Sequence, residues 1–204
     1  MAAIWLVRHA ATAWTGGRWC GRSDPPLTPA GVAEAVGLGA SLKLLLGPHA
    51  AFRSSPALRA LATAHALAPG LPVVLDSDLH EVDFGEVDGL TFDELEGRYP
   101  HLANRIAGGD LTIDWPGGET ASEVRWRATR AWNTLRSASA DSTVVAVTHG
   151  GLIRAILAEV VAGRHRAADL LEPATAIRLD WDGETCRVGA RLSPAVAPVA
   201  AESA

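Results

Sequence analysis

Two histidines occupy positions from which an imidazole could act on a bound group. His9 follows the apolar run 4–7, and His149 follows the β-branched run 143–147. Both runs are typical of buried strands. Ligands of open α/β sheets bind outside the carboxyl ends of the strands, so two parallel neighbouring strands would bring both imidazoles to one edge.

Cationic side chains and helix starts accompany the two histidines. Arg8 precedes His9, and Arg59 lies in the first turns of a helix whose start signal is Ser55-Pro56. Backbone N–H groups at that helix start and at Gly150-Gly151 offer further anion contacts. A lone strand-end histidine is more often a structural hydrogen-bond donor, and Arg59 alone would suit a solvated helix face. Together, these groups suit a dianionic phosphoryl group.

Four sequence blocks between residue 4 and about residue 155 carry a family resemblance. They are Arg8-His9-x-x-Thr12, Ser54-Ser55-Pro56-x-x-Arg59-Ala60-x-x-Thr63-Ala64, Leu79-x-Glu81-x-x-Phe84-Gly85-x-x-x-Gly89 and Thr148-His149-Gly150-Gly151. In this order the blocks resemble the histidine phosphatase superfamily, whose members are phosphoglycerate mutase-like. The resemblance implies a single α/β domain with a mostly parallel central sheet flanked by helices.

The resemblance also implies a two-step phosphoryl transfer. By matching position, His9 would be the nucleophile that forms a phosphohistidine, and Glu81 would be the proton donor to the leaving group, with Asp83 as the second candidate for that donor. Arg8, Arg59 and His149 would bind the phosphoryl oxygens, with His149 protonated or donating. The further positions that would contact substrate are Thr12, Thr15, Gly21 and Gly150. No metal or other cofactor is implied.

Three residues differ from the common family pattern. Ala10 stands where glycine commonly follows the nucleophilic histidine, which is tolerated if the backbone lies outside the left-handed region. Thr15 follows Trp14 where relatives often carry asparagine, and Cys20 stands where glutamine is frequent.

The compact interval between Glu81 and His149 is similar to the phosphatase branch, because the cofactor-dependent mutases carry an extra segment there. Hydrolysis of a small phosphorylated metabolite is therefore the main hypothesis. Mutase-type phosphoryl transfer and a non-catalytic relative that binds a phospholigand are the alternatives. A metal hydrolase with His9, His149 and Glu81 as ligands is disfavoured, because Arg8 and Arg59 would repel a divalent cation.

The loops could shape the pocket for the leaving group. Trp115, beside Pro116 in a glycine-rich segment, could stack on a ring or sugar face, or could equally anchor its loop. The other candidates for the pocket rim are Trp14, Arg18, Trp19, Arg22 and His80.

Composition limits the remaining classes. The chain has 204 residues, 48% hydrophobic content, 18 Lys+Arg and 23 Asp+Glu, with a net charge of −5. The acidic balance argues against a nucleic-acid partner. The two distant cysteines exclude a disulfide scaffold. No run approaches the roughly 20 apolar residues of a membrane span, and no signal peptide is evident, so we expect a cytoplasmic protein. A homodimer would be compatible with the family.

Helices and strands should alternate within one domain covering residues 1–192, followed by a flexible tail at 193–204. Thr28-Pro29 predicts a helix start, and Thr120 with Glu123 fits a capping box. We predict strands at 4–7, 73–75 and 143–147, helices at 29–45, 56–68, 93–102 (broken by Pro100), 121–136 and 152–161, and a terminal hairpin at 176–181 and 187–192.

Overall fold

The apolar strand that precedes His9 lies inside a six-stranded sheet. The computed structural model describes residues 2–47, 49–110, 112–140, 142–161 and 171–194. In these residues the strand order is β3-β2-β4-β1-β5-β6. The first four strands in this order run parallel, whereas β5 pairs antiparallel with β1 and β6 pairs antiparallel with β5. The sheet is therefore mostly parallel, as predicted.

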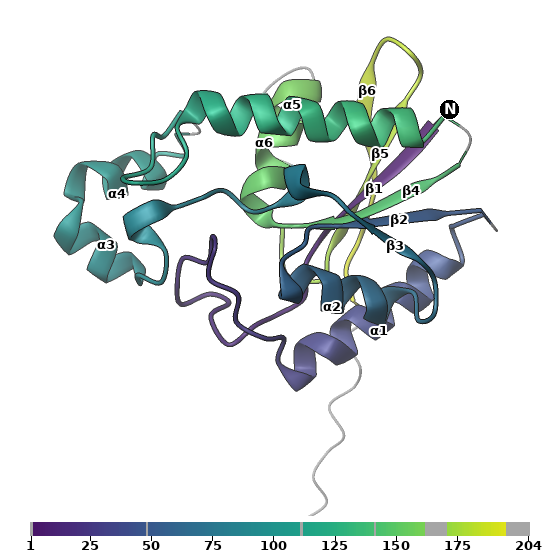
Figure 1. Ribbon diagram of the computed structural model, residues 1–204, viewed down its shortest axis with the longest axis horizontal. Helices are drawn as coiled ribbons and strands as arrows, with labels where there is room; N and C mark the ends of the chain where they lie inside the picture. The colour runs from purple at the N-terminus through teal and green to yellow at the C-terminus, as the bar shows by residue number, and fades with distance from the viewer. Residues whose placement is uncertain (1, 48, 111, 141, 162–170, 195–204) are drawn as a thin grey trace, which may run out of the picture.

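The strands and helices follow one another in an alternating order (Figure 1). The strands are β1 (Ala2–Arg8), β2 (Ala51–Ser54), β3 (Val73–Leu75), β4 (Val144–Thr148), β5 (Ala176–Trp181) and β6 (Cys186–Leu192). The α-helices are α1 (Pro29–Lys43), α2 (Leu58–Leu67), α3 (Phe92–Arg98), α4 (Pro100–Ala107), α5 (Ala121–Ala138) and α6 (Gly150–Val160). Two short 3₁₀ helices, η1 (Ser77–Leu79) and η2 (Gly85–Val87), follow β3.

Two pairs of helices cover the two faces of the sheet (Figure 1). Successive side chains of a strand point to opposite faces. Accordingly, Ile4 and Leu6 of β1 are fully buried in the cluster that includes α5 and α6. Trp5 and Val7 are buried in the cluster that includes α1 and α2. This alternation explains why the strand is apolar on both sides.

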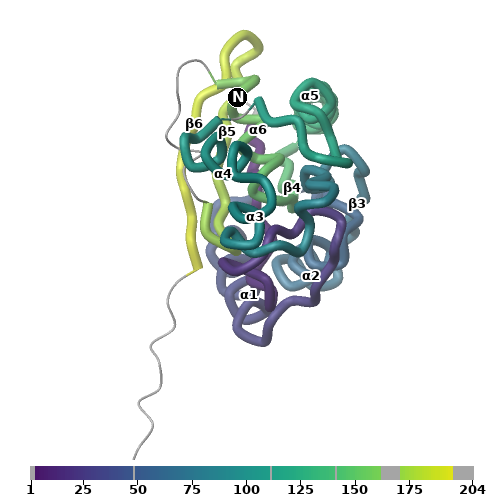
Figure 2. The backbone as a smooth tube through the Cα atoms, turned by 90° about the vertical axis from the view of Figure 1, so that its left-hand side faces the viewer, coloured from purple at the N-terminus to yellow at the C-terminus, as the bar shows by residue number. Residues whose placement is uncertain are grey.

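A third hydrophobic cluster lies beyond the carboxyl ends of the parallel strands, where α3 and α4 extend to the left in Figure 1 and toward the viewer in Figure 2. Its buried residues include Phe84 and Val87 from the segment around η2, and Leu95 and Ala103 from the two helices. Trp19 and Trp115 pack against it from two other loops. These loops therefore meet above the edge of the sheet at which His9 lies.

Most of the helix boundaries were predictable from local chemistry. The hydroxyl of Thr28 accepts a hydrogen bond from the Gly31 N–H, and Thr120 with Glu123 forms the expected capping box. The prediction was wrong for α2, which begins at Leu58 rather than at Pro56 and has no cap from its own segment. The carboxylate of Asp24 instead accepts hydrogen bonds from the first backbone N–H groups of this helix.

Strand β2 was not predicted, because its four residues include a single large apolar side chain, that of Phe52. The strand forms because β3 and β4 pair with it on both sides. Both cysteines are free, as expected. Within the described residues, every helix is too short or too polar to cross a membrane. Most of the predicted flexible tail, residues 195–204, lies outside the described residues.

Candidate active site

The two histidines lie side by side at the carboxyl edge of the sheet. Strands β1 and β4 are parallel neighbours whose last residues, Arg8 and Thr148, are register partners. His9 continues the pairing through its N–H, which donates to the Thr148 carbonyl at 2.9 Å. The imidazole centroids of His9 and His149 are 5.1 Å apart. The expectation that both imidazoles share one edge is therefore confirmed.

A cavity of about 450 Å³ opens above this edge. Most of the predicted site residues line it, namely Arg8, His9, Thr12, Thr15, Glu81 and Gly150. Of the predicted rim, Trp14, Arg18 and Trp19 also line it. Arg59 and His149 are not on its lining and are almost completely buried. The structure thus brings one group of predicted residues to the cavity wall and leaves Arg59 and His149 behind that wall.

The imidazole of His9 is held neutral and in one orientation. Its Nδ1 lies 2.8 Å from the Ala10 carbonyl oxygen, so Nδ1 carries the proton that it donates, and Nε2 keeps its lone pair. The side chain is buried, and burial together with the nearby Arg59 guanidinium lowers the pKa of His9 to about 3. At neutral pH this ring is therefore uncharged, with a free lone pair on Nε2.

Three buried side-chain nitrogens have no hydrogen-bond partner within the described part of the chain. They are Arg8 Nε, Arg59 Nε and His149 Nδ1. All three belong to residues that the sequence nominates for phosphoryl binding. A buried polar group without a partner costs roughly 1–3 kcal/mol, and an anion accepting from these nitrogens would remove that cost.

The terminal nitrogens of Arg59 are already used by the protein. Nη1 donates to the Ser23 carbonyl at 2.7 Å and Nη2 donates to the Gly21 carbonyl at 2.9 Å. Nη1 also forms an ion pair with Asp24 at 3.1 Å. Arg59 therefore fixes the loop 20–24 to the start of α2, and within this arrangement Nε is its unpaired donor.

Of the two forms expected for His149, protonated or donating, the surroundings favour a neutral ring that donates. Burial and then the charges of His9 and Arg59 lower the pKa of His149 well below its ordinary value. Its Nε2 lies 2.9 Å from the Ser55 hydroxyl oxygen, which itself accepts the Ala57 N–H at 3.2 Å. If the Ser55 hydroxyl donates to Nε2, the proton of His149 is on Nδ1, and this tautomer keeps the expected donor.

The carboxylate of Glu81 lies at the N-terminus of α6. Oε2 accepts the Gly151 N–H and Oε1 accepts the Leu152 N–H, both at 3.1 Å, and Oε1 also accepts the N–H of Val82 at 2.9 Å. These contacts place the carboxylate at the positive end of the α6 helix dipole. A β-carbon on Gly151 would lie 2.4 Å from Oε1, so a larger residue at this position would displace the Glu81 carboxylate.

The other predicted substrate contacts differ in how available they are. The N–H of Gly21 donates to the Asp88 carboxylate at 3.0 Å, so it is not free for a substrate. The hydroxyl of Thr15 accepts the Thr12 N–H at 2.9 Å. Ala10 is buried and lies outside the left-handed region, so its methyl group is accommodated without backbone strain.

A second cavity, of about 460 Å³, adjoins the first and is more apolar. The two cavities share Trp19, Phe84, Ile106, Gly151 and Arg154 on their linings. The ring of Trp115 lies 4.5 Å from that of Phe84 and 5.4 Å from that of Trp19, measured between centroids. Trp115 thus both anchors its loop in an aromatic cluster and lines this second cavity. Arg22 and His80, also predicted for the rim, line neither cavity.

The alternative with three metal ligands finds no support in the side-chain geometry. Within the described residues, no group of three or more His, Cys, Asp or Glu side chains is arranged to hold a metal ion. In particular, the carboxylate of Glu81 is engaged by backbone N–H groups, and Nε2 of His149 is next to a hydroxyl.

Comparison with known families gives the identity of the fold. Residues 4–191 match the model of the histidine phosphatase superfamily, branch 1. The chain belongs to this superfamily. This membership agrees with the four ordered sequence blocks and with the α/β fold.

Proteins similar to this chain are named as phosphoglycerate mutases or as phosphatases. The chain is 38% identical over 155 residues to the bifunctional protein Rv2228c of Mycobacterium tuberculosis, a match that covers 74% of this chain and 42% of that protein. It is 32% identical over 168 residues to the 2,3-bisphosphoglycerate-dependent phosphoglycerate mutase 2 of Gloeobacter violaceus, covering 78% and 76% of the two chains. The chain therefore spans less than half the length of Rv2228c.

Among solved structures, the mycobacterial glucosyl-3-phosphoglycerate phosphatase Rv2419c, in complex with VO₃, superposes with a TM-score of 0.80 at 28% identity. The superposition covers 93% of this chain and 98% of that one. Phosphatases and phosphoglycerate mutase-like proteins of the superfamily are thus both similar to this chain.

Proposed function

We propose that the protein is a metal-independent phosphomonoesterase that acts through a phosphohistidine on His9. The observation that supports this most directly is the pairing of a neutral imidazole with three unpartnered nitrogens from Arg8, Arg59 and His149. These nitrogens would donate hydrogen bonds to the oxygens of a phosphoryl group, and the positive charge of the two guanidinium groups would stabilise the transition state.

The first step transfers the phosphoryl group to the protein. Nε2 of His9 forms a bond to phosphorus as the bond between phosphorus and the ester oxygen breaks. Glu81 gives its proton to the departing oxygen, which leaves as the alcohol. Nδ1 of His9 keeps its proton throughout, because the Ala10 carbonyl accepts it.

The second step releases phosphate. The Glu81 carboxylate takes a proton from water, the water oxygen attacks phosphorus, and the bond to Nε2 breaks. Inorganic phosphate leaves, and both His9 and Glu81 return to their starting protonation states. Hydrolysis requires only that water reaches the phosphohistidine, and the open cavity beside His9 is consistent with that.

The substrate class is a small phosphomonoester whose alcohol part has an apolar body. The adjoining cavity lined by Trp19, Phe84 and Trp115 supports this choice, because aromatic walls favour ring or hydrocarbon surface over a second charged group. Arg154, on the border of both cavities, could contact a polar substituent at the junction.

Turnover of p-nitrophenyl phosphate by the purified protein tests the proposal. We expect hydrolysis that persists in EDTA, inhibition by vanadate, and loss of turnover in His9→Ala with an unchanged unfolding transition. Quenching with labelled substrate should trap an acid-labile, alkali-stable phosphoryl-protein bond that His9→Ala lacks. Loss of activity in EDTA would favour a metal hydrolase, whereas phosphate binding without turnover would favour the non-catalytic alternative.

The similarity to a phosphoglycerate mutase makes mutase-type transfer the second candidate. Incubation with 3-phosphoglycerate and a bisphosphorylated primer separates the two activities. Isomerisation that exceeds phosphate release would favour the mutase, and phosphate release alone would favour the phosphatase.

A further inference from the structure

The segment that carries Glu81 lies outside regular secondary structure. It connects η1, which ends at Leu79, to η2, which begins at Gly85. Backbone carbonyls in such a segment lack the partners that a helix or sheet ladder provides, and they must find other donors when buried. The position of the Glu81 carboxylate therefore depends on whatever holds this segment.

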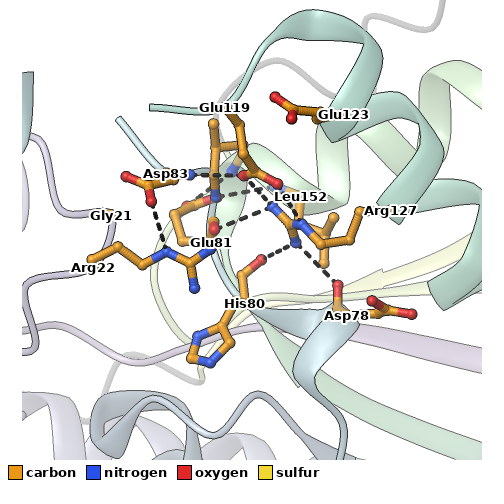
Figure 3. Close-up of polar contacts among 12 residues, drawn as sticks. Gly21, Arg22, Asp78, His80, Glu81, Asp83, Glu119, Glu123, Arg127 and Leu152 are labelled. Carbon is orange, nitrogen blue, oxygen red and sulfur yellow. Dashed lines mark hydrogen bonds and ion pairs between the residues drawn. The ribbon is translucent and has the colours of Figure 1, made fainter. Parts of the chain in front are cut away.

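The side chain of Arg127, on α5, holds this segment through hydrogen bonds to its backbone carbonyls. Nη1 of Arg127 donates to the carbonyls of Asp78, at 3.1 Å, and His80, at 2.6 Å (Figure 3). Nη2 donates to the carbonyl of Glu81 itself, at 3.2 Å. The remaining N–H groups donate to the Glu119 carboxylate, from Nε at 2.8 Å and from Nη2 at 2.7 Å. All five N–H bonds of the guanidinium thus have an acceptor.

Glu119 extends this contact to the other side of Glu81. Its Oε2 also accepts the Asp83 N–H at 2.8 Å, and its own N–H donates to the Asp83 carbonyl at 2.9 Å (Figure 3). The side chains of Arg127 and Glu119 are only 9% and 15% exposed, so solvent screens this ion pair weakly. Together the two residues bind the backbone at Asp78, His80, Glu81 and Asp83.

The neighbouring ion pair on α5 is different in kind. Arg130 contacts the side chain of Asp78, is 44% exposed, and makes no hydrogen bond to the backbone around Glu81 within the described residues. It attaches the same helix to the same segment without fixing its carbonyls. Arg130 is therefore a matched control for the simple docking of α5 on η1.

We propose that the buried Arg127–Glu119 pair positions Glu81 for proton transfer, which makes both members positioning residues of the reaction. The pair fixes the backbone of Glu81 from α5, while the N-terminus of α6 fixes its carboxylate. The distance from that carboxylate to the ester oxygen is then set by two helices rather than by a free loop. This inference rests on the proposed role of Glu81 as proton donor.

The test compares two esters that need that proton to different degrees. An alkyl phosphate has a strongly basic leaving oxygen, whereas p-nitrophenolate leaves without help. We expect Arg127→Lys and Glu119→Gln to lower kcat/KM, which reports only the steps up to release of the alcohol, by about 100-fold for ethyl phosphate, the lower range of general-acid effects, and by less than about fivefold for p-nitrophenyl phosphate. Arg130→Gln should leave kcat/KM unchanged for both esters.

Glu81→Gln gives the reference loss. In that background Arg127→Lys or Glu119→Gln should add little, because residues that act through one group are not additive. Glu119→Gln keeps the shape of the side chain, so it preserves the test if Arg127→Lys does not fold. Equal loss of kcat/KM on both esters, or no loss on either, would overturn the positioning role. If Glu81→Gln itself lowers kcat/KM equally for both esters, the assignment of Glu81 as proton donor fails first, and the inference fails with it.

Discussion

The Nδ1 atom of His9 lies 2.8 Å from the carbonyl oxygen of Ala10, the next residue in the chain. This contact fixes the tautomer of the ring, because a carbonyl oxygen can only accept. Ala10 is in turn held by its N–H, which donates to the Thr63 hydroxyl on α2 at 3.0 Å. The direction of the nucleophilic lone pair is thus coupled to the sheet edge and to a neighbouring helix.

The lowered pKa of His9 predicts how stability depends on pH. The unfolded chain binds a proton at His9 near pH 6.5, but the folded chain binds it only near pH 3. Between these values the unfolded state holds more protons, so the free energy of unfolding falls as pH falls from 6.5 toward 3. Each such histidine contributes a slope of about 1.4 kcal/mol per pH unit.

Denaturant unfolding at several pH values measures this slope. His9→Gln should reduce the slope of the unfolding free energy against pH, between pH 6 and pH 4, by one histidine's contribution. At pH 8 the two proteins should differ in the free energy of unfolding only through the change in packing. An unchanged slope in the variant would mean that His9 is not held neutral. His149 acts in the same direction, so the wild-type slope should exceed that of a single site.

Arg59→Ala should affect both the chemistry and the loop 20–24. Loss of one oxyanion donor costs roughly 3–4 kcal/mol of transition-state stabilisation, so kcat should fall at least about 100-fold. The carbonyls of Gly21 and Ser23 also lose their donors, which should lower the free energy of unfolding. Kinetics on p-nitrophenyl phosphate together with chemical unfolding separates the two effects. A kinetically silent Arg59→Ala would show that its Nε does not contact the phosphoryl group.

Gly151→Ala should displace the Glu81 carboxylate, because the new β-carbon would lie 2.4 Å from Oε1. We expect a greater loss of kcat/KM for ethyl phosphate than for p-nitrophenyl phosphate. Gly37→Ala in α1 is the matched control, since a β-carbon there meets no atom within 4 Å. That control should keep full activity and gain about 0.5–1 kcal/mol of stability from the better helix propensity of alanine. Equal activity of the two variants would show that the contact with Glu81 is relaxed at no cost.

Trp115→Ala tests the apolar cavity as the site for the leaving group. Ethyl and hexyl phosphate have equally basic leaving oxygens but differ by four methylenes, each worth roughly 0.8 kcal/mol when fully buried. The wild-type protein should prefer the hexyl ester in kcat/KM by at least about tenfold, and Trp115→Ala should reduce that preference. Trp126→Ala removes an equally large ring that is 69% exposed and lines neither cavity, so it should change neither rate. Absence of a preference in the wild-type protein would contradict the substrate class proposed above.

The parts of the site that depend on residues close together in the chain were predictable from sequence. His9 and His149 each follow a strand, and the parallel pairing of β1 with β4 makes their proximity a consequence of the fold. The start of α1 and the start of α5 were predictable for the same reason, since Thr28 and Thr120 cap helices of their own segment.

The parts that depend on contacts between distant segments were not predictable. Asp24 caps α2 from 34 positions earlier in the chain, and a free carboxylate in a proline-containing loop gives no sign of that role. The contact of Arg127 with the backbone of Glu81 spans 46 positions and joins a helix to an irregular segment. Arg127 has no distinguishing feature in sequence among the other arginines of its helix. The neutral state of His149 likewise depends on burial by several elements rather than on adjacent residues.

Within the described residues, the hydrophobic cluster formed by α3, α4 and the segment around η2 shares no buried residue with the clusters on the two faces of the sheet. Amino-acid changes there can remodel the space proposed above for the departing alcohol while the scaffold that supports the imidazoles keeps its packing. Selection for activity on new metabolites could therefore proceed through changes in this hydrophobic cluster with little loss in the free energy of unfolding. Libraries aimed at altered substrate range are best confined to it.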